Sequence, residues 1–143
     1  MPDSGNTAPA KLKRGFRQLV EEANCEIETV AIKDAKRLLG QDGVVFVDLR
    51  DPRELEREGK IPGAFHCPRG MLEFWVDPES PYHKPVLVSG KRLLFYCGSG
   101  WRSALSTKTV QDMGLTNVCH LGGGYTAWKS AGGEIEALTA RPK

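Results

Sequence analysis

Cysteine and histidine are both scarce in this sequence, with four and three copies in 143 residues. The cysteines lie far apart and form no CxxC pair: Cys25, Cys67, Cys97 and Cys119. This spacing excludes a zinc site built on paired cysteines and a small fold held together by disulfides. Cys67 and Cys119 each adjoin a histidine, but neighbouring side chains of a strand point to opposite faces, so no shared metal is expected. We therefore expect free thiols, as in the reducing cytoplasm, with no metal or cofactor.

A strong net charge and a long apolar run are absent as well. Lys and Arg number 20 against 18 Asp and Glu, and this net charge of +2 argues against a nucleic-acid surface. No apolar segment approaches the length that crosses a membrane. The basic run Lys11–Arg14 lacks the apolar stretch that follows the charges of a secretory signal. We expect a soluble, cytoplasmic monomer or homodimer that binds neither nucleic acid nor membranes.

A chain of this length suffices for one domain with its own core. Residues 1–14 are polar and charged, which predicts a disordered tail. The apolar residues that follow recur with the spacing of one helix face: Phe16, Leu19, Val20 and Ala23. This spacing predicts an N-terminal helix extension over 15–26 that packs on its own domain rather than on a second copy. Residues 27–138 form the predicted domain, and 139–143 are a second tail.

Within the domain, strand and helix patterns alternate. Apolar runs predict strands at 44–47, 64–67, 93–96 and 118–121. Helices are predicted at 32–39, 51–58, 103–113 and 125–131, each followed within two residues by a glycine. For the second of these helices, Asp51 can cap, Pro52 suits the first helical position, and Glu54 can complete a capping box. The alternation predicts an α/β fold with a mainly parallel sheet covered by helices on both faces.

The stretch 69–92 departs from this rhythm. It is long, contains three prolines, and carries the apolar residues Met71, Leu72, Phe74 and Trp75. A connection of this length is often a wall or lid over a site. Its apolar residues fit a short helix that closes the sheet edge equally well, and the sequence leaves both interpretations open.

The segment with the most chemical information is the run from Cys97 to Ser103, between a predicted strand and a predicted helix. In a parallel sheet such a turn places Cys97 at the carboxyl ends of the strands, beside the free N–H groups of a helix start. Gly98 and Gly100 allow the backbone to wrap around an anion, and Arg102 adds a positive charge. Such surroundings favour a thiolate nucleophile. The alternative is a buried structural cysteine, but packing alone requires no anion-binding loop.

This run, Cys97-Gly98-Ser99-Gly100-Trp101-Arg102-Ser103, resembles the C-x-x-G-x-R-S active loop of the rhodanese family. Three further segments resemble family motifs in the right order: Asp48-Leu49-Arg50 with Glu54, Gly59 to Ala64, and Gly123 to Trp128. The resemblance implies a rhodanese-like three-layer fold of about five mostly parallel strands. It further implies a sulfurtransferase that moves sulfane sulfur from a donor such as thiosulfate to cyanide or a thiol. Cys97 would carry the sulfur as a persulfide, residues 98–103 would bind it, and a sulfur-relay protein is a further candidate partner.

The sequence also predicts roles for several other residues. Arg69 is expected at the pocket rim as a second cation, and Trp101 at the pocket entrance. Arg50 and Glu54 are interpreted as a structural ion pair that, with Asp48, supports the sheet edge, rather than as acid–base groups. Lys60 stands where the family usually has histidine, and is expected to shape its turn. Cys67 and Cys119 are expected to pack, with a resolving thiol as the alternative: Cys67 or Cys119 would then bridge to Cys97.

Two rival functions have to be weighed. Cysteine phosphatases and arsenate reductases of related fold use a C-x5-R loop, whereas Arg102 follows Cys97 by five positions and gives the shorter C-x4-R. The shorter loop fits one sulfur atom better than a tetrahedral oxyanion. Rhodanese-like domains also serve as regulatory or sulfur-binding modules without turnover, but such modules commonly lack the cysteine that is present here.

Overall fold

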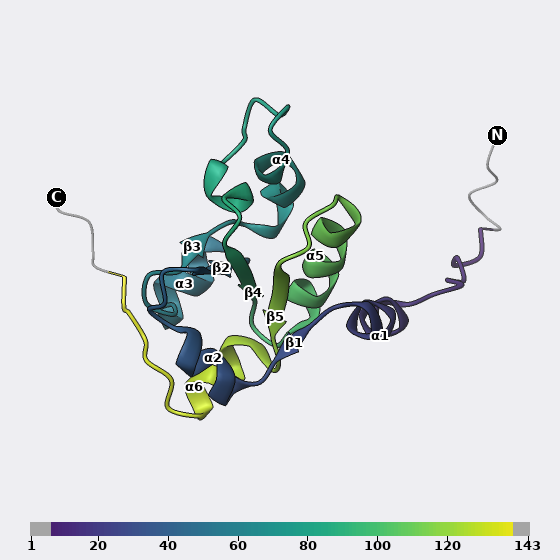
Figure 1. The fold of residues 1–143 in the computed structure, drawn as a ribbon. Helices are drawn as coiled ribbons and strands as arrows, with labels where there is room; N and C mark the ends of the chain where they lie inside the picture. Colours follow the sequence, from purple (N-terminus) through teal and green to yellow (C-terminus); the bar gives the residue numbers. More distant parts are fainter. Residues whose placement is uncertain (1–6, 139–143) are drawn as a thin grey trace, which may run out of the picture.

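The computed structural model describes residues 7–138 and contains one five-stranded sheet between layers of helices (Figure 1). The strands are β1 (Thr29–Val30), β2 (Val44–Asp48), β3 (Phe65–His66), β4 (Arg92–Tyr96) and β5 (Val118–Leu121). They lie in the order β1-β5-β4-β2-β3, and every pair is parallel. The predicted parallel α/β sheet is therefore confirmed. The predicted tail at 139–143, and residues 1–6 of the other, lie outside the described residues.

Six α-helices and two short 3-10 helices surround the sheet within the described residues. The α-helices are α1 (Phe16–Glu26), α2 (Ile32–Leu38), α3 (Pro52–Glu58), α4 (Leu72–Val76), α5 (Trp101–Asp112) and α6 (Gly124–Ser130). The 3-10 helices are η2 (Arg69–Met71) and η3 (Pro85–Val88). The capping box predicted for α3 is present, since the Asp51 side chain accepts from Arg53 N and the Glu54 side chain accepts from Asp51 N.

The two faces of the sheet carry separate apolar cores. Successive residues of β4 alternate between them: Leu94 and Tyr96 face α2 and α6, whereas Leu93 and Phe95 face α4 and α5. This alternation follows from the period of two residues in a strand. Figure 1 shows α2 and α6 together on one side of the sheet, with α5 on the other. The prediction of helices on both faces is thus confirmed.

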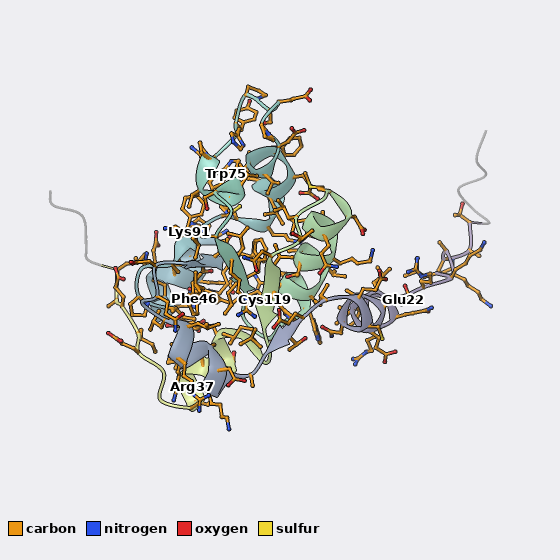
Figure 2. All side chains as sticks on the ribbon, viewed as in Figure 1. Glu22, Arg37, Phe46, Trp75, Lys91 and Cys119 are labelled. Atoms are coloured by element: carbon orange, nitrogen blue, oxygen red, sulfur yellow. The ribbon has the colours of Figure 1, made fainter. Side chains whose placement is uncertain are left out.

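The predicted N-terminal helix forms and packs on its own chain. Val20 and Ala23 of α1 are buried against Ala104 of α5, which accounts for half of the predicted apolar face. Phe16 and Leu19, the other half, stay partly exposed. Figure 2 shows α1, marked by Glu22, as an outlying helix, while Cys119 of β5 lies in the body of the molecule.

The stretch 69–92 is part of the core. Leu72 and Val76 of α4 and Leu87 of η3 are buried against the sheet residues Val47 and Phe95. Trp75, labelled on α4 in Figure 2, stacks edge to face on Phe65 of β3. Of the two interpretations, the short helix packed at the sheet edge is the one the structure contains.

The helix after the cysteine loop begins earlier than predicted. It starts at Trp101 rather than near Ser103, because Gly100 adopts φ +107° as the residue before the first turn and allows the chain to enter the helix there. Among residues 7–138, no helix is long and apolar enough to cross a membrane.

Candidate active site

Cys97 follows the last residue of β4, and its sulfur lies at the start of α5. Its Sγ accepts hydrogen bonds from the backbone N–H groups of Gly100 at 3.2 Å and Ser103 at 3.3 Å. The first N–H groups of a helix have no acceptor within the helix, so a sulfur placed here receives bonds that would otherwise go to water. Cys97 is only 1% exposed. The arrangement stabilises negative charge on the sulfur or on an atom bonded to it.

The glycines at 122–124 pass directly beneath this loop. At the start of α6, Tyr125 N donates to Cys97 O at 2.7 Å and Thr126 N donates to Gly98 O at 3.0 Å. A Cβ on Gly124 would lie 2.6 Å from Gly98 O, so no other residue fits there. Because a trans peptide places C=O and N–H on opposite sides, the N–H groups that follow these two carbonyls point away from α6. The α6 N-terminus therefore orients the amides of the cysteine loop.

Arg102 is paired with Glu54, which corrects the prediction of an Arg50–Glu54 pair. Arg102 Nη1 donates to Glu54 Oε1 at 2.8 Å and Nη2 donates to Oε2 at 3.1 Å. These bonds to Arg102 lower the pKa of the Glu54 carboxyl to about 2. Glu54, and then the sulfur of Cys97, raise the pKa of Arg102 against the opposing effect of burial. Arg102 thus adds its charge beside the thiol while joining α3 to α5.

Arg50 pairs instead with Asp48, two residues earlier on the same face of the chain. Arg50 Nη2 lies 2.7 Å from Asp48 Oδ2, and both side chains are buried. The same Nη2 donates to Gly59 O at 2.8 Å, and the guanidinium lies 4.1 Å from the centre of the Tyr125 ring. This pair holds β2, the end of α3 and α6 together, so the predicted supporting role of Asp48 and Arg50 fits their positions.

Trp101 lies at the mouth of the loop. It is 50% exposed, and its ring packs on Phe16 of α1 with the centroids 4.7 Å apart. Phe16 is itself 46% exposed, and the Arg17 guanidinium lies over its ring, 5.1 Å from the centroid. The N-terminal helix therefore supplies part of the surface around the cysteine loop.

Arg69 pairs with Glu73 rather than with the cysteine loop. Its Nη1 lies 3.8 Å from Glu73, and it lines a hollow between α1 and α5 with Glu26 and Lys108. The expected role as a second cation at the rim of the Cys97 pocket thus finds no support in these contacts. Lys60 shapes its turn as predicted, because its Nζ donates to Ala64 O at 3.0 Å.

The remaining cysteines differ in accessibility. Cys25 is exposed, whereas Cys67 and Cys119 are buried. Burial raises the pKa of the Cys67 thiol to about 12 and that of Cys119 to about 11. Thiols held in the protonated form make poor partners for disulfide exchange, so the packing role fits both residues.

A group of polar side chains behind Cys97 was missed by the sequence reasoning. The Cys97 thiol donates to Ser103 Oγ at 3.6 Å, and Ser103 Oγ lies 2.8 Å from His120 Nδ1. The other ring nitrogen of His120, Nε2, lies 3.1 Å from both Asn24 Oδ1 and Thr29 Oγ1. The one available signal was a histidine inside the apolar run Val118–Leu121, since a buried polar side chain requires a partner.

Comparisons with known proteins identify relatives of this chain. The family model for the rhodanese-like domain matches residues 31–131. The chain is 33% identical to thiosulfate:glutathione sulfurtransferase of Saccharomyces cerevisiae over 76% of this chain and 82% of that protein. It is 35% identical to an uncharacterized Synechocystis protein over 73% of this chain and 53% of that protein. The chain thus spans about half the length of this second relative.

One solved structure is considerably more similar in sequence. A Rhodopseudomonas palustris protein of unknown function, described as a possible tyrosine phosphatase, superposes with a TM-score of 0.88 at 55% identity. The match covers 91% of this chain and 100% of that chain. It extends beyond the 101 or so residues of the family match, so the likeness covers more than the common domain.

Proposed function

Since the chain belongs to the rhodanese-like domain family, we propose that it is a sulfurtransferase that carries sulfane sulfur as a persulfide on Cys97. The observation that supports this most directly is the position of Sγ, which accepts from Gly100 N and Ser103 N at the start of α5. Two amide donors and the nearby Arg102 favour the thiolate that attacks sulfur donors. The same groups favour a persulfide anion, whose charge lies one atom further out.

In the loading step, the Cys97 thiolate attacks the outer sulfur of a donor such as thiosulfate. A bond forms between Sγ and that sulfur while the S–S bond of the donor breaks, and sulfite leaves with the electron pair. The negative charge of the product lies on the outer sulfur. The N–H groups of the loop that point away from α6 are the donors we assign to that charge, because anions bind to such successive amides.

In the unloading step, an acceptor nucleophile attacks the outer sulfur. The carbon of cyanide, or the sulfur of an acceptor thiolate, forms the new bond while the bond to Sγ breaks. The Cys97 thiolate returns, and thiocyanate or the persulfide of the acceptor leaves. The exposed rings of Trp101 and Phe16 are the surface we assign to the acceptor, either a small thiol or a sulfur-relay protein. Free thiols throughout the chain fit a cytoplasmic location for this chemistry.

Hydrolysis of a phosphate ester is the second candidate, because the R. palustris structure is described as a possible tyrosine phosphatase. Phosphate recognition by arginine uses two parallel N–H donors. Here both guanidinium Nη atoms of Arg102 donate to Glu54. With this pairing and the C-x4-R spacing, sulfur transfer is the function that the site supports better.

The test compares the wild-type protein with Cys97→Ser in three assays. We expect cyanide-dependent thiocyanate formation from thiosulfate or glutathione persulfide in the wild type alone, with no hydrolysis of p-nitrophenyl phosphate by either protein. Intact-mass spectrometry should find one extra sulfur atom, mapped to Cys97, after incubation with the donor. Thiocyanate formation by Cys97→Ser at the wild-type rate, or phosphatase activity that requires Cys97, would contradict the proposal.

A further inference from the structure

Behind the cysteine loop, hydrogen-bonded side chains from four helices and strands form a continuous line. It runs from Cys97 to Ser103 of α5, to His120 of β5, and then to Asn24 of α1 and Thr29 of β1. Asn24 and Thr29 lie before the first residue of the family match, which begins at residue 31. The steps described above for sulfur transfer use neither His120 nor its two outer partners.

His120 is neutral at physiological pH. It is 3% exposed, and burial lowers its pKa to about 4. Protonation through Ser103 would create a buried imidazolium, and at pH 7 about one molecule in a thousand would carry it. The groups within hydrogen-bond distance of the ring are uncharged: Ser103, Asn24 and Thr29. His120 is therefore poorly suited to act as the base that removes the thiol proton.

The direction of the hydrogen bonds follows from the neutral ring. A neutral imidazole has one donor and one acceptor nitrogen. Asn24 Oδ1 accepts only, so Nε2 carries the hydrogen and Nδ1 is the acceptor. Ser103 therefore donates its single hydroxyl hydrogen to His120 Nδ1.

Two other acceptors compete for that hydrogen. Gly100 O lies 3.4 Å from Ser103 Oγ and the Cys97 sulfur lies 3.6 Å away, whereas His120 Nδ1 lies at 2.8 Å. The shortest of these contacts wins because the strength of a hydrogen bond falls with distance. The oxygen lone pairs of Ser103 are then the part of the hydroxyl that faces Cys97.

We propose that His120 is a positioning residue that turns the Ser103 hydroxyl hydrogen away from Cys97. The Ser103 oxygen then disfavours the Cys97 thiolate relative to the Cys97 persulfide. A lone pair facing Sγ accepts from a thiol but repels a thiolate. In the persulfide, Sγ is bonded to sulfur and the charge lies one atom further out, so this repulsion is smaller. The persulfide half of the inference rests on the proposed function, whereas the thiol half does not.

The decisive variant is His120→Leu. Without an acceptor at 120, the Ser103 hydroxyl can donate to the Cys97 sulfur, and a charge-assisted hydrogen bond replaces a repulsion. We expect iodoacetamide to alkylate Cys97 about three- to tenfold faster than in the wild type at pH 7, as measured by peptide mass spectrometry. A side chain that merely filled space would give an unchanged or lower rate.

A double-mutant cycle shows whether the effect passes through the hydroxyl. In a Ser103→Ala background, His120→Leu should leave the alkylation rate of Cys97 unchanged, because no hydroxyl remains to turn. An equal acceleration in both backgrounds would overturn the proposal, as would an unchanged or slower rate in His120→Leu itself.

The other cysteines report on the fold in the same samples. Cys67 is buried directly after β3, which β4 and β2 separate from the β5 strand of His120, so its alkylation should stay slow. Exposed Cys25 gives the reference rate. If Cys67 becomes reactive in His120→Leu, the core has loosened, and Asn24→Leu/Thr29→Val decides instead. This double variant removes both hydrogen-bond partners of His120 Nε2. The ring can then carry its hydrogen on Nδ1, which leaves the Ser103 hydroxyl free to donate to Cys97.

In that double variant an accelerated alkylation of Cys97 supports the inference, and the wild-type rate overturns it. Gln111→Ala is the matched control, because it removes a different bond between α5 and α1, from Gln111 Nε2 to Glu26 O, and should keep the wild-type rate. Failure of the wild type in the thiocyanate assay would count against the proposed function alone, since alkylation needs no sulfur donor.

Discussion

Glu54 and Arg102 face each other across the cysteine loop, where Arg102 Nη1 donates to Glu54 Oε1 at 2.8 Å and Nη2 donates to Oε2 at 3.1 Å. The carboxylate belongs to the first turn of α3, where it also accepts from Asp51 N, and the guanidinium belongs to the first turn of α5. A Cβ at position 98 would lie only 3.1 Å from Arg102 Nη2. The glycine at this position therefore leaves the space that the ion pair occupies. The cation beside Cys97 is thereby held in place by a partner from another helix.

Removal of the Arg102 charge should slow the reactions of Cys97. In Arg102→Ala we expect alkylation at pH 7 and persulfide formation to fall about three- to tenfold, because a nearby cation stabilises thiolate. Arg102→Lys should keep part of the rate, since it retains the charge but not the bidentate geometry. Arg53→Ala is the control, because Arg53 is an exposed cation in the first turn of α3, beside Glu54, the partner of Arg102. Equal losses in the Arg102 and Arg53 variants would mean that only net charge matters.

The ion pair should also appear in the acid stability of the protein. The folded-state pKa of Glu54 is about 2 against an ordinary 4.5, so its contribution is complete above about pH 4.5 and is lost as the pH falls toward 2. Glu54→Gln keeps a capping side chain but no charge. We expect the wild type to lose about 1 kcal/mol more unfolding free energy than Glu54→Gln across this range, since solvent screens the 41% exposed Arg102. An equal loss of unfolding free energy in the two proteins across this pH range, measured by urea unfolding, would refute the assignment.

The buried His120 should cause a separate loss of stability, at a higher pH than the loss expected from Glu54. Its pKa is about 4 in the folded protein against 6.5 ordinarily, so the unfolded chain takes up a proton in a range where the folded chain does not. Stability from this source is complete above about pH 6.5 and is lost as the pH falls to about 4, by up to about 3 kcal/mol. Thermal or urea unfolding of His120→Leu should lack this slope between the two pH values. A wild-type slope in the variant would show that another group titrates there.

Gly124→Ala should damage the loop out of proportion to its size. The backbone there has φ +65°, and a Cβ would lie 2.6 Å from Gly98 O and 2.7 Å from Cys97 O. Gly132 has a similar φ of +74° but nothing within 4 Å of its Cβ position, so Gly132→Ala measures the backbone cost alone, about 1–2 kcal/mol. We expect Gly124→Ala to lose more unfolding free energy than this and to lose most thiocyanate formation. Equal stability and activity in the two variants would contradict the close passage of α6 beneath the loop.

Local patterns were enough to predict much of this molecule. The apolar runs at 44–47 and 93–96 predicted strands buried on both faces, and the two strands pair in the centre of the sheet. The residues Asp51, Pro52 and Glu54 predicted a helix start with a capping box, which is present. These features follow from side chains a few residues apart, whose relative positions the backbone geometry of a strand or helix already determines.

The predicted Arg50–Glu54 ion pair was wrong because the helix begins between the two residues. Four residues place two side chains together only within a continuous helix. Asp51 is extended, with ψ 143°, so the helix begins after it and Arg50 stays on the strand side with Asp48. Glu54 then turns to Arg102, 48 residues away in sequence.

The sequence alone predicted a parallel α/β fold, a cysteine between a buried strand and a helix, and the family to which the chain belongs. Only the tertiary structure decided which side chains meet around that cysteine. Asn24 and His120 are 96 residues apart, and they meet because β5 lies beside β1 and α1 packs on α5. Strand order and helix packing depend on the whole core at once, and a local period of two or 3.6 residues carries no information about them.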